Sequence, residues 1–189
     1  MELKKEITKE LLAESFYELM LTHDFEKITI KMITDSSNVI RPTFYYYFQD
    51  KYELLTWIIE SEFFQSLVIT PEKAIWDYYP AFIQYIYDSR RFLKNALTFE
   101  GQNSLRKYLL DRWAPIIVND FQNAFSSKEW ETFFVEWYVK MSQEAYLDWL
   151  GQKEMIPPEE FLSQHIEAFK EFFVAVQNSF DKYHQRENN

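Results

Sequence analysis

The chain has 189 residues, a net charge of −10 from 20 Lys and Arg against 30 Asp and Glu, no Cys and two Gly. The missing cysteines exclude disulfides, thiolate nucleophiles and Cys-ligated zinc, and two glycines are too few for a glycine-rich phosphate loop. Because attraction to phosphate is additive, the acidity argues against a nonspecific nucleic-acid coat protein, but it leaves room for a small DNA-reading domain.

Apolar residues recur at helical spacing along most of the chain, and we expect an all-α protein. No alternating strand pattern, internal repeat or low-complexity tract interrupts this periodicity. The expected helices cover residues 4–22, 29–37, 42–48, 50–66, 72–88, 90–99, 103–124, 128–150 and 158–180.

Several helix ends carry recognisable signals. Thr29 and Asp50 are suited to cap the helices that follow them, with Glu53 completing a capping box after Asp50. Asn38 tolerates the left-handed conformation of a tight turn. Farther along, we expect Ser126 to cap the helix 128–150 and Gly151 to end it.

We divide the chain into a helix-turn-helix domain (1–49), a connecting helix (50–66), a helical effector-binding and dimerisation domain (67–183) and a frayed polar tail (184–189). No apolar run reaches the length of a membrane span, and the N-terminus lacks the apolar stretch of a signal peptide. We therefore expect a cytoplasmic protein without a membrane partner.

Residues 29–51, called here the reading unit, contain the most specific signal. Two short helices meet at a tight Ser-Asn turn, which is the arrangement of a helix-turn-helix that reads a major groove. A helix of two turns is not stable alone, so we expect it to dock on its neighbours. Helical spacing places Phe44, Tyr45 and Phe48 toward the core and directs Thr43, Tyr46 and Tyr47 elsewhere.

The reading unit resembles the DNA-binding signature of the TetR family of bacterial regulators, T-x-x-x-I-A-x-x-A-G-V-S-x-x-x-F-Y-x-Y-F-x-x-K-x-x-L. The matching residues are Thr29, Ile33, Val39, Phe44, Tyr45, Tyr47, Phe48, Lys51 and Leu54. Ser37-Asn38 replaces the usual Ala-Gly, and Ile40 replaces a Ser that would cap the helix and donate to a phosphate. The segments 43–48 and 53–58 are also similar to the dihydroxyacetone kinase regulator-like subgroup, which has Thr-Phe-Tyr-x-Tyr-Phe followed by Glu-Leu-Leu-x-Trp-Ile.

This resemblance implies a homodimeric regulator that binds a palindromic DNA operator, as either a repressor or an activator. It implies DNA contacts at Thr29, Lys31, Arg41, Pro42, Thr43, Tyr46, Tyr47 and Lys51. Arg41, Thr43 and Tyr46 would face base edges or the nearby backbone, and the Thr29, Lys31, Tyr47 and Lys51 side chains would hold phosphates. Alternatively, the three tyrosines are only core and rim aromatics, which we favour for Tyr45 but not for Tyr46 and Tyr47.

The distribution of charge predicts selective rather than general DNA binding. Residues 1–51 hold seven cations and nine acids, a net of −2, and residues 52–189 carry the other −8. The cations within or beside the reading unit are Lys27, Lys31, Arg41 and Lys51. If all four met phosphates in each half of a dimer, the log–log slope of affinity against salt would reach at most roughly −7.

The second domain is rich in aromatic residues, and the family resemblance implies that it holds a pocket for an unknown small-molecule effector. The candidate lining is Trp76, Tyr79, Phe82, Tyr85, Phe99, Tyr108 and Trp113. The last two helices are suited to a four-helix dimer interface through Trp130, Phe134, Trp137, Met141, His165, Phe169, Phe173 and Val176. For both sets, the alternative is ordinary core packing within one chain.

The sequence contains no recognisable catalytic constellation. No His follows a Glu by three residues, and there is no His-Glu-x-x-His motif and no Gly-flanked nucleophilic Ser. We therefore expect neither enzyme activity nor a metal or cofactor. The remaining alternative is a protein-binding co-regulator that keeps the fold but binds DNA weakly, which the net acidity and Ile40 would favour.

Overall fold

The computed structural model describes residues 2–67, 69–70, 72–99, 101, 103–121 and 125–187. Within these residues the chain is helical and contains no strand, which confirms the all-α fold. The elements are α1 (Glu2–Met20), η1 (Phe25–Lys27), α2 (Ile30–Ser37), α3 (Arg41–Tyr47), α4 (Lys51–Glu62), η2 (Phe64–Ser66), α5 (Ile75–Asp88), α6 (Arg90–Leu97), α7 (Leu105–Asp120), α8 (Lys128–Gly151) and α9 (Pro158–Glu187).

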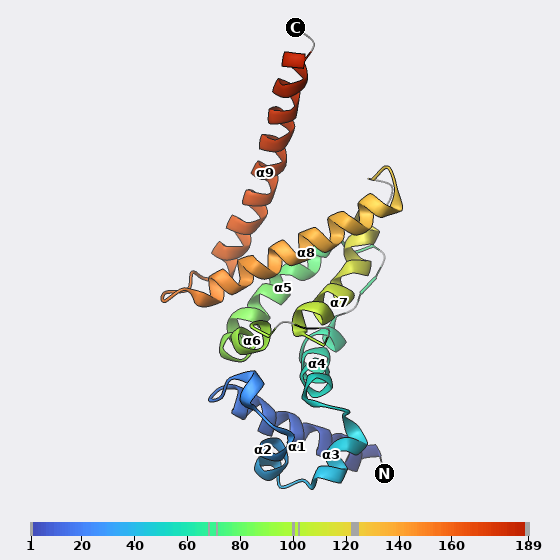
Figure 1. The fold of residues 1–189 in the computed structure, drawn as a ribbon, viewed down its shortest axis with the longest axis vertical. Coiled ribbons are helices and arrows are strands. Elements are labelled where there is room, and N and C mark those ends of the chain that lie inside the picture. Colours follow the sequence, from blue (N-terminus) through green and yellow to red (C-terminus); the bar gives the residue numbers. More distant parts are fainter. Residues whose placement is uncertain are drawn as a thin grey trace.

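The helices form a small N-terminal unit and a larger body (Figure 1). Helices α1, α2 and α3 lie together at one end of the molecule, and α4 leads from them to the body formed by α5 to α8. Helix α9 begins beside the body and projects from it, so that its last turns lie far from α1. None of the described helices is both long and apolar enough to cross a lipid bilayer.

A continuous cluster of buried apolar side chains joins the two parts. It runs from Phe16 in α1 through Phe44 in α3 and Ile58 in α4 to Trp113 and Trp149 in the body. Because close-packed interiors transmit displacement, a movement in the body can reach the N-terminal unit through α4.

Asn95 in α6 adds a polar link between the same two parts. Its Nδ2 donates to the carbonyl oxygens of Met20, at 2.8 Å, and His23, at 2.7 Å. Its Oδ1 accepts from the backbone N–H of Phe25 at 2.8 Å. One side chain therefore satisfies three backbone groups where α1 ends and η1 begins, which are positions that the helix itself leaves unbonded.

Three predicted helix ends differ from the structure. The cap of α8 is Ser127 rather than Ser126, and its Oγ accepts from the Trp130 N–H at 3.3 Å. Gly151 is the last helical residue rather than a left-handed cap, and no described glycine has a positive φ. Helix α7 ends at Asp120, while residues 122–124 of the predicted helix lie outside the described residues.

The predicted frayed tail is also different, because α9 continues to Glu187. After Pro158 the sequence has neither Gly nor Pro to stop the helix, so polar composition alone did not mark its end. Residues 184–187 are thus helical, and residues 188–189 lie outside the described residues.

Candidate nucleic-acid interface and internal cavity

The turn between α2 and α3 has the geometry that its sequence predicts. The Thr29 hydroxyl oxygen accepts from the Met32 N–H at 3.2 Å and caps α2. Asn38 ends α2 in the left-handed conformation, with φ of 56°, and the Val39 N–H donates to the Thr34 carbonyl at 3.1 Å. These local bonds fix the direction in which α3 leaves the turn.

Helix α3 is held by its buried side. Phe44 and Phe48 are 0% and 2% exposed, and their ring centres lie 5.9 Å apart. The Phe48 ring also meets Trp57 of α4 at 5.8 Å. Asp50 caps α4 by accepting from the backbone N–H groups of the two residues at N2 and N3, at 2.8 and 2.9 Å. A helix of seven residues is thereby fixed through tertiary contacts.

The other side of α3 is open to solvent. Arg41 and Pro42 are exposed, Tyr46 is 65% exposed, and Thr43 is half-buried. Among the described residues, no ion pair engages Arg41. A free guanidinium and a hydroxyl side chain on the outer face of a docked helix are the groups that read base edges.

The prediction that Tyr45 belongs to the core was wrong. Its side chain is 51% exposed and meets Phe44 only edge-on, with ring centres 5.6 Å apart. Tyr47, by contrast, is half-buried against the core. At about 100° per residue, Tyr45 and Tyr47 both lie roughly 80° from the mean direction of Phe44 and Phe48. The helical period therefore could not predict which of the two tyrosines is buried. The packing of the core decides that it is Tyr47.

Lys51, one of the four cations assigned to the reading unit, is engaged within the fold. The Lys51 ammonium donates to the carbonyls of Phe25, Glu26 and Ile28 at 2.6, 3.2 and 2.8 Å. Burial lowers the pKa of this lysine. Lys27 forms an exposed i,i+3 pair with Asp24 at 2.5 Å, which is a weak surface contact. Since an ammonium has three donors, Lys51 would have to release a carbonyl before it could hold a phosphate.

Two other cations lie on the open side. Lys31 is exposed and forms an i,i+4 pair with Asp35, which is a weak and easily exchanged contact at a surface. Lys5, which the sequence reasoning left out, lies with its Nζ 5.6 Å from the centre of the Tyr46 ring. A hydrogen bond with the Tyr46 hydroxyl raises the pKa of Lys5. The sequence offered little indication that Lys5 lies near the reading unit, because only tertiary packing brings α1 beside α3.

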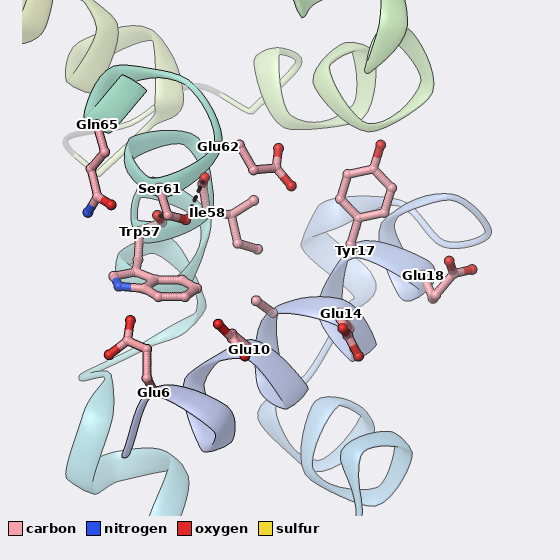
Figure 2. Close-up of a pocket in the computed structure, with 11 residues that line it drawn as sticks. Glu6, Glu10, Glu14, Tyr17, Glu18, Trp57, Ile58, Ser61, Glu62 and Gln65 are labelled. Carbon is pink, nitrogen blue, oxygen red and sulfur yellow. Dashed lines mark hydrogen bonds between the residues drawn. The ribbon is translucent and has the colours of Figure 1, made fainter. Parts of the chain in front are cut away.

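A groove between α1 and α4 gathers negative charge instead (Figure 2). The carboxylates of Glu6, Glu10, Glu14 and Glu18 follow one another along α1, and Trp57 of α4 lies near the first two. The groove has a volume of about 510 Å³. Four of the nine acids of residues 1–51 therefore line one groove, and they disfavour the approach of phosphate from this side.

The body contains a small cavity between α5, α7 and α8. Three of the seven residues predicted to form a pocket line it, namely Tyr79, Phe82 and Trp113. Its volume is about 20 Å³, which suits a water-sized occupant in this conformation. Helix α8 supplies the part of the lining that sequence reasoning missed: Tyr138, Val139, Ser142, Gln143 and Tyr146. The spacing of Tyr138, Ser142 and Tyr146, four residues apart, is the signal that could have found this hydroxyl-bearing face.

The structure does not bring the other four predicted pocket residues to this cavity. Trp76 is 37% exposed. The Tyr85 hydroxyl donates to Glu62 at 2.8 Å, and Tyr108 donates to a carboxylate of α4. Phe99 packs against the N-terminal unit, where its ring centre lies 5.5 Å from that of Phe25.

The predicted dimer residues lie on α8 and α9, but their environments differ. Trp130 and Phe173 are exposed, and Phe134 lies 6.2 Å from Phe173 between ring centres. The Trp137, Met141, Phe169 and Val176 side chains are half-buried. His165 instead turns toward α5, where its Nε2 lies 3.2 Å from the Tyr79 hydroxyl. Burial lowers the pKa of His165.

Comparison with known families assigns this architecture. Residues 76–182 match the model of a transcriptional regulator C-terminal region, TetR_C_8, which covers more than half of the chain. Residues 17–56 match the model of bacterial regulatory proteins of the tetR family. The chain belongs to the TetR family. This confirms the resemblance seen in the reading unit and makes the chain a DNA-binding regulator rather than an enzyme.

Individual relatives agree with the TetR assignment. Over 60 residues the chain is 38% identical to the HTH-type dhaKLM operon transcriptional activator DhaS of Lactococcus lactis. That match spans about a third of the relative, 32% of each chain. The solved structure of dihydroxyacetone kinase operon activator DhaS has a TM-score of 0.59 at 19% identity, covering 86% of this chain and 93% of that one. A TetR transcriptional regulator from Streptococcus agalactiae has a TM-score of 0.65 at 19% identity, covering 88% and 96%. At these identities the two structures show the shared fold.

Proposed function

We propose that this TetR-family regulator works as a homodimer that binds a palindromic operator through α3 and changes its DNA affinity when a small molecule enters the body. The observation that carries the proposal is the outer face of α3. Arg41 is exposed there without an ion pair among the described residues, beside Thr43 and Tyr46. A guanidinium forms paired hydrogen bonds with guanine, and a threonine methyl suits thymine.

Phosphate contacts would come from the edges of the same face. Lys5 on α1 and Lys31 on α2 are both exposed, and Lys5 lies beside Tyr46 of α3. The Thr29 oxygen accepts a hydrogen bond in the cap of α2, which leaves its O–H available to donate to a phosphate. Phosphate contacts orient the protein on the duplex, and the base contacts then select the sequence.

The exposed aromatic residues of α8 and α9 support dimer formation. Trp130 and Phe133 lie exposed on α8, and the exposed aromatics of α9 include Phe172, Phe173 and Phe180. Helix α9 projects beyond the body (Figure 1), so much of this apolar surface stays open to solvent, although Phe172 and Phe173 also contact rings of α8. Apolar surface of this kind marks an interface, and a second copy paired by a twofold axis would bury the same surface on both chains.

Packing beside the cavity supports a route from effector to DNA. The Phe82 ring meets Phe63 at 5.1 Å, and the Trp113 ring meets Phe64 at 5.5 Å. Phe63 and Phe64 lie directly after α4, whose Leu54 is buried in the same core as α3. A ligand that displaces Trp113 or Phe82 would thus move α4, provided that it binds one arrangement more tightly than the other.

The salt dependence of operator binding tests the DNA contacts. With Lys5 and Lys31 meeting phosphates in each protomer, a dimer makes four phosphate contacts, and the log–log slope should be about −4. Fluorescence anisotropy with a duplex selected from the upstream region of the gene measures it. Lys31→Ala should make the slope less steep by about 2, because a dimer carries two copies. Lys140→Ala, an exposed lysine on α8, is the matched control and should leave the slope unchanged.

A protein-binding co-regulator is the second candidate function, favoured by two observations. The acidic groove between α1 and α4 repels DNA, and Ile40 gives α3 no side-chain cap. A gel shift with the purified protein alone separates the two functions. Retarded operator DNA supports direct reading, whereas retardation only after addition of a second protein supports the co-regulator.

A further inference from the structure

The cavity between α5, α7 and α8 contains polar atoms that the protein does not satisfy. Trp113 Nε1, the Tyr138 hydroxyl and Ser142 Oγ are buried and make no well-formed hydrogen bond in the described part of the chain, although the Tyr138 and Ser142 oxygens lie close to the Tyr79 hydroxyl. Their side chains are only 5%, 4% and 3% exposed, and all three line the cavity. Buried polar groups are nearly always hydrogen-bonded, so three without a well-formed bond around one space point to a missing occupant.

The remaining polar groups of the lining are already paired. The Tyr79 and Tyr146 hydroxyls bond to each other, and Tyr79 also lies 3.2 Å from His165. The Gln143 amide donates to the Arg106 carbonyl at 2.8 Å. The unpaired atoms are therefore the part of the wall that is free to recognise a ligand.

The chemistry of the lining defines the ligand. Among the described residues, no Asp, Glu, Lys or Arg lines the cavity, so an ion would enter without a counter-charge. An indole N–H only donates, and therefore requires an acceptor oxygen, whereas the Tyr138 and Ser142 hydroxyls can donate or accept. Trp113, Phe82 and Ile117 provide apolar surface for a short carbon skeleton.

Resting on the proposed effector control of DNA binding, we propose that the ligand is a small uncharged molecule of a few heavy atoms whose carbonyl or hydroxyl oxygens bond to Trp113, Tyr138 and Ser142. The cavity of about 20 Å³ is smaller than such a molecule, so binding must push its walls outward. Trp113 and Phe82 are the walls that rest on Phe64 and Phe63. The small size of the cavity thus contributes to the control of DNA binding. A ligand that fitted without displacing the walls would not move α4.

Titration with simple probes tests the ligand class. The neutral probes are hydroxyacetone, 1,2-propanediol and glycerol, and lactate is an anion of matched size. At least one neutral probe should raise the melting temperature of the full chain in a saturable way and change tryptophan fluorescence, while lactate should do neither. If no neutral probe binds, or if lactate binds equally well, the ligand class is overturned.

Two variants locate the binding to the cavity. Tyr138→Phe and Ser142→Ala each remove one oxygen and should weaken the best probe about three- to tenfold. Tyr87→Phe, at a half-buried tyrosine outside the lining, should leave it unchanged. Because the deleted oxygens make no well-formed hydrogen bond to protein, both cavity variants should melt at or above the parent temperature, which separates a binding effect from misfolding. Parent-like affinity in both folded variants overturns the assignment of the site.

Operator affinity measured in the same samples separates this inference from the proposed function. A neutral probe that binds the cavity but leaves DNA affinity unchanged supports the ligand class and contradicts effector control. A charged compound that changes DNA affinity, with no response to the neutral probes, supports effector control and overturns the ligand class.

Discussion

The reading unit and the cavity region use similar aromatic and hydroxyl side chains, but the reading unit presents its polar groups to solvent and the cavity region turns them inward. In the reading unit, aromatic rings bury one side of a short helix and leave a cation and hydroxyls facing solvent. In the cavity region, hydroxyl and indole groups are turned inward, and three of them make no well-formed hydrogen bond among the described residues. A surface that reads a large polymer is exposed, while a site that senses a small molecule is enclosed by protein.

This difference suggests that the reading unit must be rigid, whereas the cavity region must be able to move. The reading unit is held by caps, a left-handed turn and a buried face, so its shape should not depend on a ligand. The cavity is bordered by Phe82 and Trp113, which lean on the end of α4. We therefore expect substitutions in the first region to remove DNA binding, and substitutions in the second to alter its control.

The largest expected effect is the loss of the buried face of α3. Phe44→Ala should lower the free energy of unfolding by about 3–5 kcal/mol, because it removes a fully buried ring and leaves a cavity. Tyr45→Ala on the same helix should cost at most about 0.5 kcal/mol, since that ring is half-exposed. Urea unfolding of both variants measures the contrast. Equal losses would mean that α3 is not anchored through Phe44.

An intermediate effect is expected at the link between the two parts. Asn95→Ala removes three hydrogen bonds to backbone groups and should lower the free energy of unfolding by about 2 kcal/mol. Asn95→Asp keeps the acceptor for the Phe25 N–H but loses both donated hydrogen bonds. Its free energy of unfolding should therefore also be lower than that of the parent. Hydrogen exchange at the end of α1 checks the location of the effect. Parent-like protection there in Asn95→Ala would show that the link does not hold α1.

The smallest effect is a pH dependence at the border of the cavity. Burial lowers the pKa of His165 from its ordinary value of 6.5, so just below pH 6.5 the folded chain binds fewer protons than the unfolded chain. Stability from this residue is therefore present above pH 6.5 and is lost as the pH falls toward the lowered pKa. Replacement by Gln should flatten the curve of melting temperature between pH 7 and 5. A parent-like curve in His165→Gln would exclude this histidine as the source.

Local signals made the reading unit predictable. Thr29, Asn38 and Asp50 each set a helix end through bonds to residues close in the chain, and the structure has all three as predicted. The motif also fixes which side chains are buried at Phe44 and Phe48. Tyr45 was misplaced because two positions lie at equal angles from the core, and a sequence period contains no information about what covers each side.

Long-range packing made the cavity unpredictable in detail. Aromatic composition suggested a pocket, but Phe99 packs on the N-terminal unit, and Trp76 is exposed. The hydroxyls of Tyr138 and Ser142 come from a helix whose aromatic stripe suggested a dimer face or ordinary core packing, not a pocket. The internal contacts of Lys51 could not be predicted for a related reason, because the carbonyls that receive its ammonium belong to a segment far from it in the sequence.

The double variant Arg41→Ala, Tyr46→Ala tests most directly whether α3 reads DNA. Its dissociation constant for a selected operator duplex should rise about 100-fold or more relative to the parent, because a base-reading guanidinium and its neighbour are both lost. An unchanged melting temperature is expected, since both side chains are exposed. A folded double variant that binds the same duplex as tightly as the parent would contradict the account.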